Sequence, residues 1–202
     1  MSEVRRVNKV ITLLVACLGT FVILLDTSIV TLAVPRIQTD LHANLSDLQW
    51  VVDAYTLPFA VLMLTAGTFG DRFGRKRLFV IGLVVFVLGS ACCGFAPALG
   101  WLFLGRAVQG IGAAALSTNS LAVLAAAFSD PRERAQAIGL FSSLSGVALA
   151  LGPLVGGALV QVGNWPLIFL VNLPIELIGF VLALPYLSES RNPDARRIDV
   201  PG

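Results

Sequence analysis

Long apolar runs dominate this chain, and the run from Leu78 to Gly105 contains no charged residue at all. A helix that spans a bilayer needs about 20 consecutive apolar residues, so this run is long enough for one full span and the start of another. Only 13% of the 202 residues are charged, and the mean hydropathy is +0.86. Soluble domains usually carry about 25% charged residues. The chain is therefore expected to fold in a lipid bilayer.

Six apolar segments divide the chain, each with about the length of one membrane crossing. They are apolar all round, whereas a soluble bundle would show polar stripes at helical spacing, and they lack the alternation of a membrane β-barrel. The chain is therefore predicted to be an all-α membrane protein with six transmembrane helices. Pro35 is expected to close the first helix. The expected parts are an N-terminus at 1–9, a bundle at 10–187 with spans at 10–34, 48–70, 78–97, 101–128, 135–161 and 166–187, and a polar tail at 188–202.

The positions of Lys and Arg predict how the helices are oriented. Three bases precede the first span, four follow the second, two follow the fourth and three follow the sixth, while the opposite side has only Arg36. Because cytoplasmic loops carry the excess of Lys and Arg, both termini are expected in the cytoplasm of a multi-pass cell-membrane protein. The loops after spans three and five are short and uncharged, so each of these spans is expected to form a tight antiparallel hairpin with the next one.

The segment 67–77, GTFGDRFGRKR, places one acid and four bases in a short turn between two apolar spans. A short basic turn is typical of a cytoplasmic loop. Its three glycines are expected to let the backbone bend and the helices approach closely. The residues that we single out in this turn are Gly67, Gly70, Asp71, Arg72, Gly74, Arg75 and Lys76.

Four ionisable residues fall inside the predicted spans: Asp26, Asp53, Arg106 and Glu176. At the bilayer centre each costs about 2.5–3.5 kcal/mol on insertion scales, so each should face a protein interior or a water-filled cavity. Asp26 and Arg106 lie at similar depth and could pair, either as a static ion pair or as a proton-coupling site whose protonation follows the opening of a cavity. Asp53 is either an interfacial anchor or a cation or proton site. The same alternatives hold for Glu176, whose partner the sequence does not identify.

Small residues form faces on the fourth and fifth spans. Ala148, Gly152 and Gly156 are four residues apart, so they line one helix face that admits another helix at backbone distance. Pro153 removes one backbone hydrogen bond in that span. Ordinary close packing in a static bundle is the alternative to a moving contact. The positions noted are Gly139, Ala148, Gly152, Pro153, Gly156 and Gly157 in the fifth span, and Gln109, Gly110 and Gly112 in the fourth.

Several classes of function lack a signal in the sequence. No nucleophile–base pair is evident, so an enzyme is not expected. The cysteines Cys17, Cys92 and Cys93 have no metal-ligand spacing, and His42 is alone, so no metal site is expected. The bases lie in short clusters between apolar runs, which argues against a nucleic-acid partner.

These segments together resemble the major facilitator superfamily. The turn 67–78 is similar to the signature of its loop between helices two and three, with Phe69 where Leu is commoner. Residues 25–35 resemble the helix-one motif of its 14-spanner drug:proton antiporters. Residues 104–112 resemble the helix-four motif, whose Arg is implicated in proton transfer. Residues 139–157 resemble the helix-five antiporter motif, with Ala148 in place of a Gly. Residues 165–174 resemble the start of helix six.

The resemblance implies a fold of two six-helix halves around a central cavity, of which this chain would supply the N-terminal one. The missing C-terminal half, or a second chain, would complete the cavity. The implied function is proton-coupled export of hydrophobic or cationic drugs by alternating access. The proton gradient would supply the energy, without a cofactor, and the halves would rock about the smooth face of helix five. A nutrient facilitator or symporter, and a non-transporting half that pairs with another chain, are the alternatives.

Overall fold

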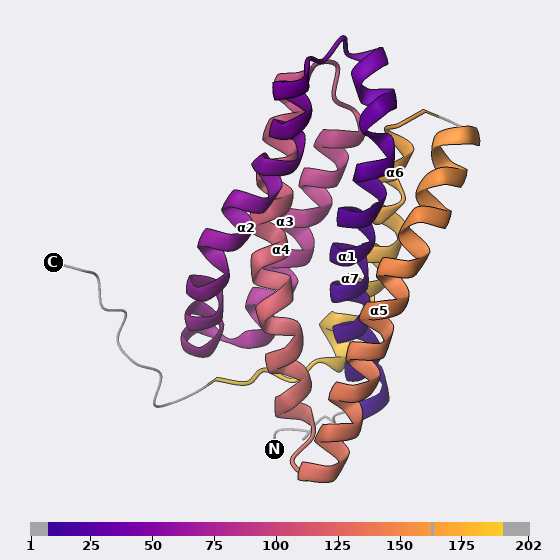
Figure 1. Cartoon of the computed structure of the whole chain (residues 1–202). Helices are drawn as coiled ribbons and strands as arrows, with labels where there is room; N and C mark the ends of the chain where they lie inside the picture. The colour runs from indigo at the N-terminus through magenta and orange to yellow at the C-terminus, as the bar shows by residue number, and fades with distance from the viewer. Residues whose placement is uncertain (1–7, 163, 192–202) are drawn as a thin grey trace, which may run out of the picture.

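The computed structural model describes residues 8–162 and 164–191. Within these ranges the chain is almost entirely helical and contains no strand. Figure 1 shows the helices packed side by side in one bundle, with the start of α1 and the end of α7 at the same end. The helices are α1 (Lys9–Asp40), α2 (Leu45–Phe73), α3 (Arg75–Gly94), α4 (Leu99–Ala127), α5 (Pro131–Val162), α6 (Leu167–Leu170) and α7 (Asn172–Tyr186).

The helices confirm the prediction of an all-α protein with six spans. α1 to α5 and the combined stretch Leu167–Tyr186 are each long and apolar enough to cross a membrane. Large apolar side chains cover much of the outer surface; Leu64, for example, is 82% exposed and Leu154 is 70% exposed. Such a surface suits lipid and not water, because a soluble bundle turns a polar face outward.

The observed helices extend past most of the predicted limits, most clearly at Pro35. The sequence predicted that α1 ends at this proline, but the helix continues to Asp40. A proline inside a helix removes one backbone hydrogen bond. Here Ala33 and Ile37, on either side of it, are fully buried in a cluster with Leu48 of α2, and this packing keeps the last turns helical. The sixth span was predicted as one helix, but the structure divides it into α6 and α7.

Side-chain caps fix several helix starts. The side chain of Asn8 accepts a hydrogen bond from the Ile11 amide at the start of α1. At α2, Asn44 and Asp47 form a reciprocal capping box with bonds of 3.0 and 2.9 Å. At α5, Asp130 accepts from two amides of the first turn. These bonds satisfy N–H groups that would otherwise lack partners at helix starts.

α1 and α4 lie at the centre of the bundle. α2 and α3 pack against α4, whereas α5 and α7 pack against α1, and α1 also contacts α4 (Figure 1). α2 and α5 bury the smallest share of their residues. Both helices therefore present broad apolar surfaces outside the bundle.

Only one of the two predicted hairpins forms. α3 and α4 pack tightly as expected, but the prediction for the pair after α5 is wrong, because α5 and α7 each pack along α1. The short helix α6 contacts both α1 and α3, and so carries the chain from one side of α1 to the other. The small residues of α5 fit α1 closely, as described below, and this contact replaces the expected hairpin.

Glycines set the close contact between α3 and α4. A Cβ on Gly112 would lie 2.5 Å from the Phe86 nitrogen and 2.9 Å from the Gly82 oxygen. On the α3 side, a Cβ on Gly89 would lie 2.6 Å from the Gln109 nitrogen. Because these neighbours are backbone atoms, they cannot move without separating the helices.

We therefore expect Gly112→Ala to lower the stability of the purified protein by about 1–3 kcal/mol through overpacking. Gly139→Ala is the matched control, since Gly139 has no neighbour within 4 Å and alanine is the better helix former by about 1 kcal/mol. Detergent-induced unfolding followed by circular dichroism measures both variants. Equal effects of the two substitutions would contradict the packing account.

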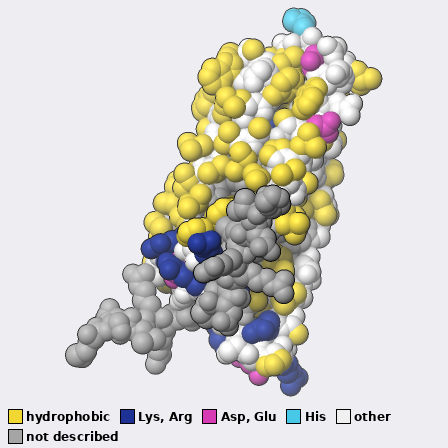
Figure 2. Space-filling view, turned by 90° about the vertical axis from the view of Figure 1, so that its left-hand side faces the viewer, with side chains coloured by type: hydrophobic (Ala, Val, Ile, Leu, Met, Phe, Trp, Pro, Cys, Tyr) yellow, Lys and Arg dark blue, Asp and Glu magenta, His cyan; other side chains and the backbone are white. Residues whose placement is uncertain are grey.

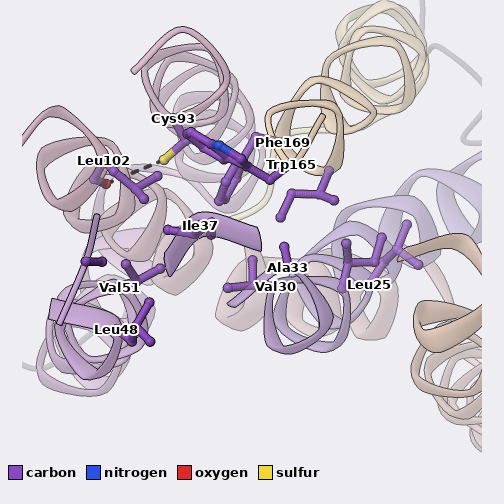
Figure 3. Close-up of a cluster of buried hydrophobic side chains, with 13 residues drawn as sticks. Leu25, Val30, Ala33, Ile37, Leu48, Val51, Cys93, Leu102, Trp165 and Phe169 are labelled. Carbon is purple, nitrogen blue, oxygen red and sulfur yellow. Dashed lines mark hydrogen bonds between the residues drawn. The ribbon is translucent and has the colours of Figure 1, made fainter. Parts of the chain in front are cut away.

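A buried apolar cluster lies in the half of the bundle farthest from the described termini, and Figure 3 shows its side chains in close-up. Trp165 is 4% exposed, and its ring meets the ring of Phe169 edge-on at 6.2 Å. The cluster also holds Val51 and Cys93, which touch the polar groups described next. It thus forms one wall of the candidate site.

Candidate functional site

Asp26 of α1 and Arg106 of α4 form an ion pair inside the bundle. Nη1 of Arg106 donates to Oδ2 of Asp26 over 2.6 Å. Asp26 is 0% exposed and Arg106 is 2% exposed, so both charges are shielded from the exterior of the described bundle. The structure thus brings together the two charges that the sequence predicted to pair.

Neutral polar side chains complete the surroundings of the carboxylate. Oδ1 of Asp26 accepts from Nδ2 of Asn172 at 2.9 Å and from Nε2 of Gln109 at 3.3 Å. The Gln109 Nε2 atom also donates to the Ser90 hydroxyl oxygen at 2.8 Å. All three side chains are fully buried. Side chains from α1, α3, α4 and α7 therefore meet around one carboxylate.

Arg106 has further partners that hold its guanidinium in place. Nε donates to the Val51 carbonyl at 3.1 Å, and Nη1 also donates to Oε1 of Gln109 at 2.9 Å. The guanidinium lies over the Tyr55 ring, 4.2 Å from the ring centroid, and over the Phe169 ring, 5.8 Å from its centroid. Charge-assisted hydrogen bonds and the faces of aromatic rings both stabilise a buried cation.

Helix geometry accounts for this arrangement. Arg106 and Gln109 are three residues apart on α4, so they share one face of that helix. Gly89, next to Ser90, lets α3 approach the backbone at Gln109 closely enough for the Gln109–Ser90 hydrogen bond. On α2, Val51 and Tyr55 are one turn apart and face Arg106 together.

The arrangement gives Asp26 a cationic partner and two amide donors, which together can hold a charged carboxylate inside the bundle. Two polar atoms next to the cluster, the Tyr55 hydroxyl and Oδ1 of Asn172, have no hydrogen-bond partner among the described residues. Such atoms would gain a partner from a water molecule or a bound compound.

The other two predicted ionisable residues lie outside this cluster. Asp53 is partly exposed, and its side chain makes no ion pair or hydrogen bond within the described part of the chain. It is two positions from Val51 on α2, which turns it away from the face that meets Arg106. Glu176 of α7 is 1% exposed, but neither of its oxygens has a hydrogen-bond partner in residues 8–162 and 164–191.

The basic turn holds its acid by an ion pair. Arg75 at the start of α3 donates over 2.9 Å to Asp71, four residues before it near the end of α2, and Arg72 lies over the Phe73 ring at 5.5 Å. Glu189, which follows α7, accepts from the Lys76 amide at 3.2 Å, and the Ser190 carbonyl accepts from the Arg75 amide at 3.1 Å. The segment after α7 thereby caps the start of α3.

The three glycines of the turn have different roles. Gly74 has φ of 120°, a conformation that favours glycine, and it separates α2 from α3. A Cβ on Gly70 would lie 1.9 Å from Oδ1 of Asn119, so this glycine admits α4. Gly67 has no neighbour closer than 4.0 Å to such a Cβ. The expected bend and close approach therefore rest on Gly74 and Gly70 but not on Gly67.

The small-residue face of α5 packs against α1. A Cβ on Gly152 would lie 1.8 Å from the Ser28 hydroxyl oxygen, and one on Gly156 would lie 3.2 Å from Ile29. Ala148 on the same face is fully buried, and Pro153 lies within the helix. The expectation that two halves rock about this face needs correction, because α1 of the same bundle already covers it.

The remaining motif glycines divide in the same way. Gly110 of α4 lies against α2, where a Cβ would be 2.3 Å from the backbone carbonyl oxygen of Tyr55. Gly139 and Gly157 of α5 have no neighbour within 4 Å. The structure thus gives Gly110 a packing role and shows no such role for the last two.

Sequence reasoning missed several residues of these contacts, among them Ser90, Asn172 and Glu189. Ser90 and Asn172 are neutral and lie in apolar spans, so no charge drew attention to them. Asn172 stands one helical turn before Glu176 on the same face of α7, which is a signal that could have found it. Glu189 lies in the predicted polar tail, where its contact with α3 leaves no local signal.

Comparison with known proteins identifies the family. The Major Facilitator Superfamily profile matches residues 16–202. The multidrug resistance protein Stp of Mycobacterium tuberculosis is 43% identical over 96% of this chain, which covers 36% of that protein. The methylenomycin A resistance protein of Bacillus subtilis is 41% identical over 91% of this chain and 40% of its own length. This chain thus spans well under half the length of these relatives.

Solved structures agree on the fold. The proton:xylose symporter XylE superposes with a TM-score of 0.77 at 19% identity, over 87% of this chain and 44% of that chain. The peptide transporter POT superposes with a TM-score of 0.75 at 18% identity, over 85% of this chain and 37% of that chain. The matched portions correspond to one six-helix half of the fold. This chain, a multi-pass membrane protein, belongs to the major facilitator superfamily.

Proposed function

We propose that this chain is the N-terminal half of a proton-coupled exporter of hydrophobic, cationic compounds. The observation that carries the proposal is the enclosed Asp26–Arg106 pair, a proton-binding group and a cation joined across α1 and α4. The names of the similar proteins support export: one is a multidrug resistance protein, and another, from Streptomyces glaucescens, is a tetracenomycin C resistance and export protein.

In the proposed cycle, opening of the cavity separates α1 from its neighbours and exposes Asp26. Asp26 then binds a proton, which removes its attraction to Arg106. Reclosing after proton release restores the pair. A second half, or another chain, would complete the cavity against the exposed surfaces of α2 and α5.

The surface charge supports the proposed orientation. Figure 2 shows Lys and Arg side chains gathered at one end of the molecule and the sole histidine, His42, at the other. Under the positive-inside rule the basic end, with both described termini, would face the cytoplasm. The turn 67–77 would then act as a latch on the inner side.

Proteoliposomes that contain the complete gene product and a luminal pH dye test the direction of coupling. An inward ethidium gradient is expected to drive protons out and to raise the luminal pH, as antiport requires. A fall in luminal pH would indicate symport instead. No pH change despite ethidium uptake would exclude proton coupling.

A further inference from the structure

We propose that α3 and α7 form a second binding site, open to the lipid, for a small hydrophobic ammonium ion whose charge pairs with Glu176. The site is a cavity of about 200 Å³. One face of each helix forms its walls, because the positions on α7 recur at helical spacing. The lining residues are Leu83, Val84, Val87 and Leu88 on α3, and Leu173, Glu176, Leu177 and Phe180 on α7.

Glu176 supplies the one polar group among the described residues that line this cavity. Its side chain is 1% exposed, and neither carboxyl oxygen has a hydrogen-bond partner within the described residues. Asp26 is equally buried, yet three side chains donate to it. Asn172 lies one turn from Glu176 but directs its amide to Asp26. The carboxyl of Glu176 is therefore the acceptor that the bundle leaves without a donor.

The ionised form of a carboxyl without a partner is unfavourable in apolar surroundings. An ammonium ion would supply both the missing charge and, in a primary to tertiary amine, the missing N–H donor. Ionisable groups inside membrane spans usually mark binding or transport sites for this reason. An ammonium ion would stabilise the ionised form of Glu176, so the cavity favours a cationic occupant over a neutral one.

The rim of the cavity is apolar and accessible from the outer surface of the bundle. Leu88 and Leu177 are both 60% exposed, and Val84 is 41% exposed. In a spanning bundle such a surface faces hydrocarbon, so the occupant must be soluble in lipid apart from its charge. A cavity of about 150 Å³ holds benzene, so the space here fits one ring with a short ammonium group.

The proposed site differs in place from the Asp26–Arg106 cluster. The cavity lies between α3 and α7, and none of its lining residues bonds to Asp26 or Arg106. Binding there needs no proton gradient. That a compound bound here is then exported rests on the proposed function, whereas binding itself does not.

Tritiated benzyltrimethylammonium is the probe, and its binding to the detergent-solubilised complete gene product is measured by scintillation proximity. We expect saturable binding that Glu176→Gln weakens about tenfold or more, since a hydrogen-bonded or paired charge is lost. Neopentylbenzene, the neutral isostere with carbon in place of nitrogen, should not compete. Equal binding by Glu176→Gln, or equal competition by the isostere, would overturn the proposal and leave the cavity as a slot for an acyl chain.

A second pair of variants tests the cavity without altering the charge. Val84→Trp fills the space and should weaken binding, while Ile178→Trp, at a lipid-exposed position on α7 outside the lining, should not. Equal effects of the two would overturn the proposed position.

Asp26→Asn separates the two proposals. It should abolish ethidium-driven proton flux but retain probe binding. Loss of probe binding in Asp26→Asn together with normal binding in Glu176→Gln would overturn the second site and leave the proposed exporter standing.

Discussion

Asp26→Asn is expected to abolish ethidium-driven proton flux while the protein still folds and reaches the membrane. Asparagine keeps the size of the side chain and one oxygen acceptor, but it cannot bind and release a proton at this position. Arg106 retains the Val51 carbonyl, Gln109 and the Tyr55 ring as partners, so most of the site survives. Flux in proteoliposomes, normalised to folded protein by size-exclusion chromatography, is the measurement.

Asp53→Asn is the matched control, because it removes the same charge from a partly exposed side chain outside the cluster. It is expected to retain most of the flux. Full flux in Asp26→Asn would remove Asp26 from the mechanism. Loss of flux in Asp53→Asn alone would transfer the coupling role to α2.

The six helices could be predicted because a bilayer leaves the chain few alternatives. Inside the hydrocarbon every backbone polar group must be satisfied within the span, so runs of the right length and composition read as helices. Helix limits were harder to predict. Pro35 usually ends a helix, but burial of Ala33 and Ile37 keeps α1 intact to Asp40, and that burial depends on α2.

The charged pair of the site was predictable for a related reason. A charge inside a span is unfavourable enough that a partner at similar depth is expected, and Asp26 and Arg106 met this condition. Ser90 and Asn172 are neutral, and they gain importance only once the bundle places them beside the carboxylate. Which helix covers the small face of α5 was likewise invisible, because Gly152 and Gly156 admit any helix equally well.

Arg106→Met is expected to lower the stability of the protein by about 3–5 kcal/mol, the effect of leaving one member of a buried ion pair without its partner. The side chain keeps similar length and apolar volume, so the loss reflects charge and not a cavity. Two amide donors, Gln109 and Asn172, remain on Asp26, which places the expected loss near the lower limit. Arg132→Met, at an exposed position in the first turn of α5, is the control and should change stability little.

The double variant Asp26→Asn/Arg106→Met distinguishes a static ion pair from a proton-coupling site. Removing both charges eliminates the unpaired one, so the double variant should regain much of the stability that Arg106→Met loses. If the pair only held α1 to α4, transport would return together with stability. If Asp26 carries the proton, stability returns but the flux stays absent, because the amide that replaces the carboxylate does not bind and release a proton. We expect the second result, and recovery of both properties would establish the pair as structural.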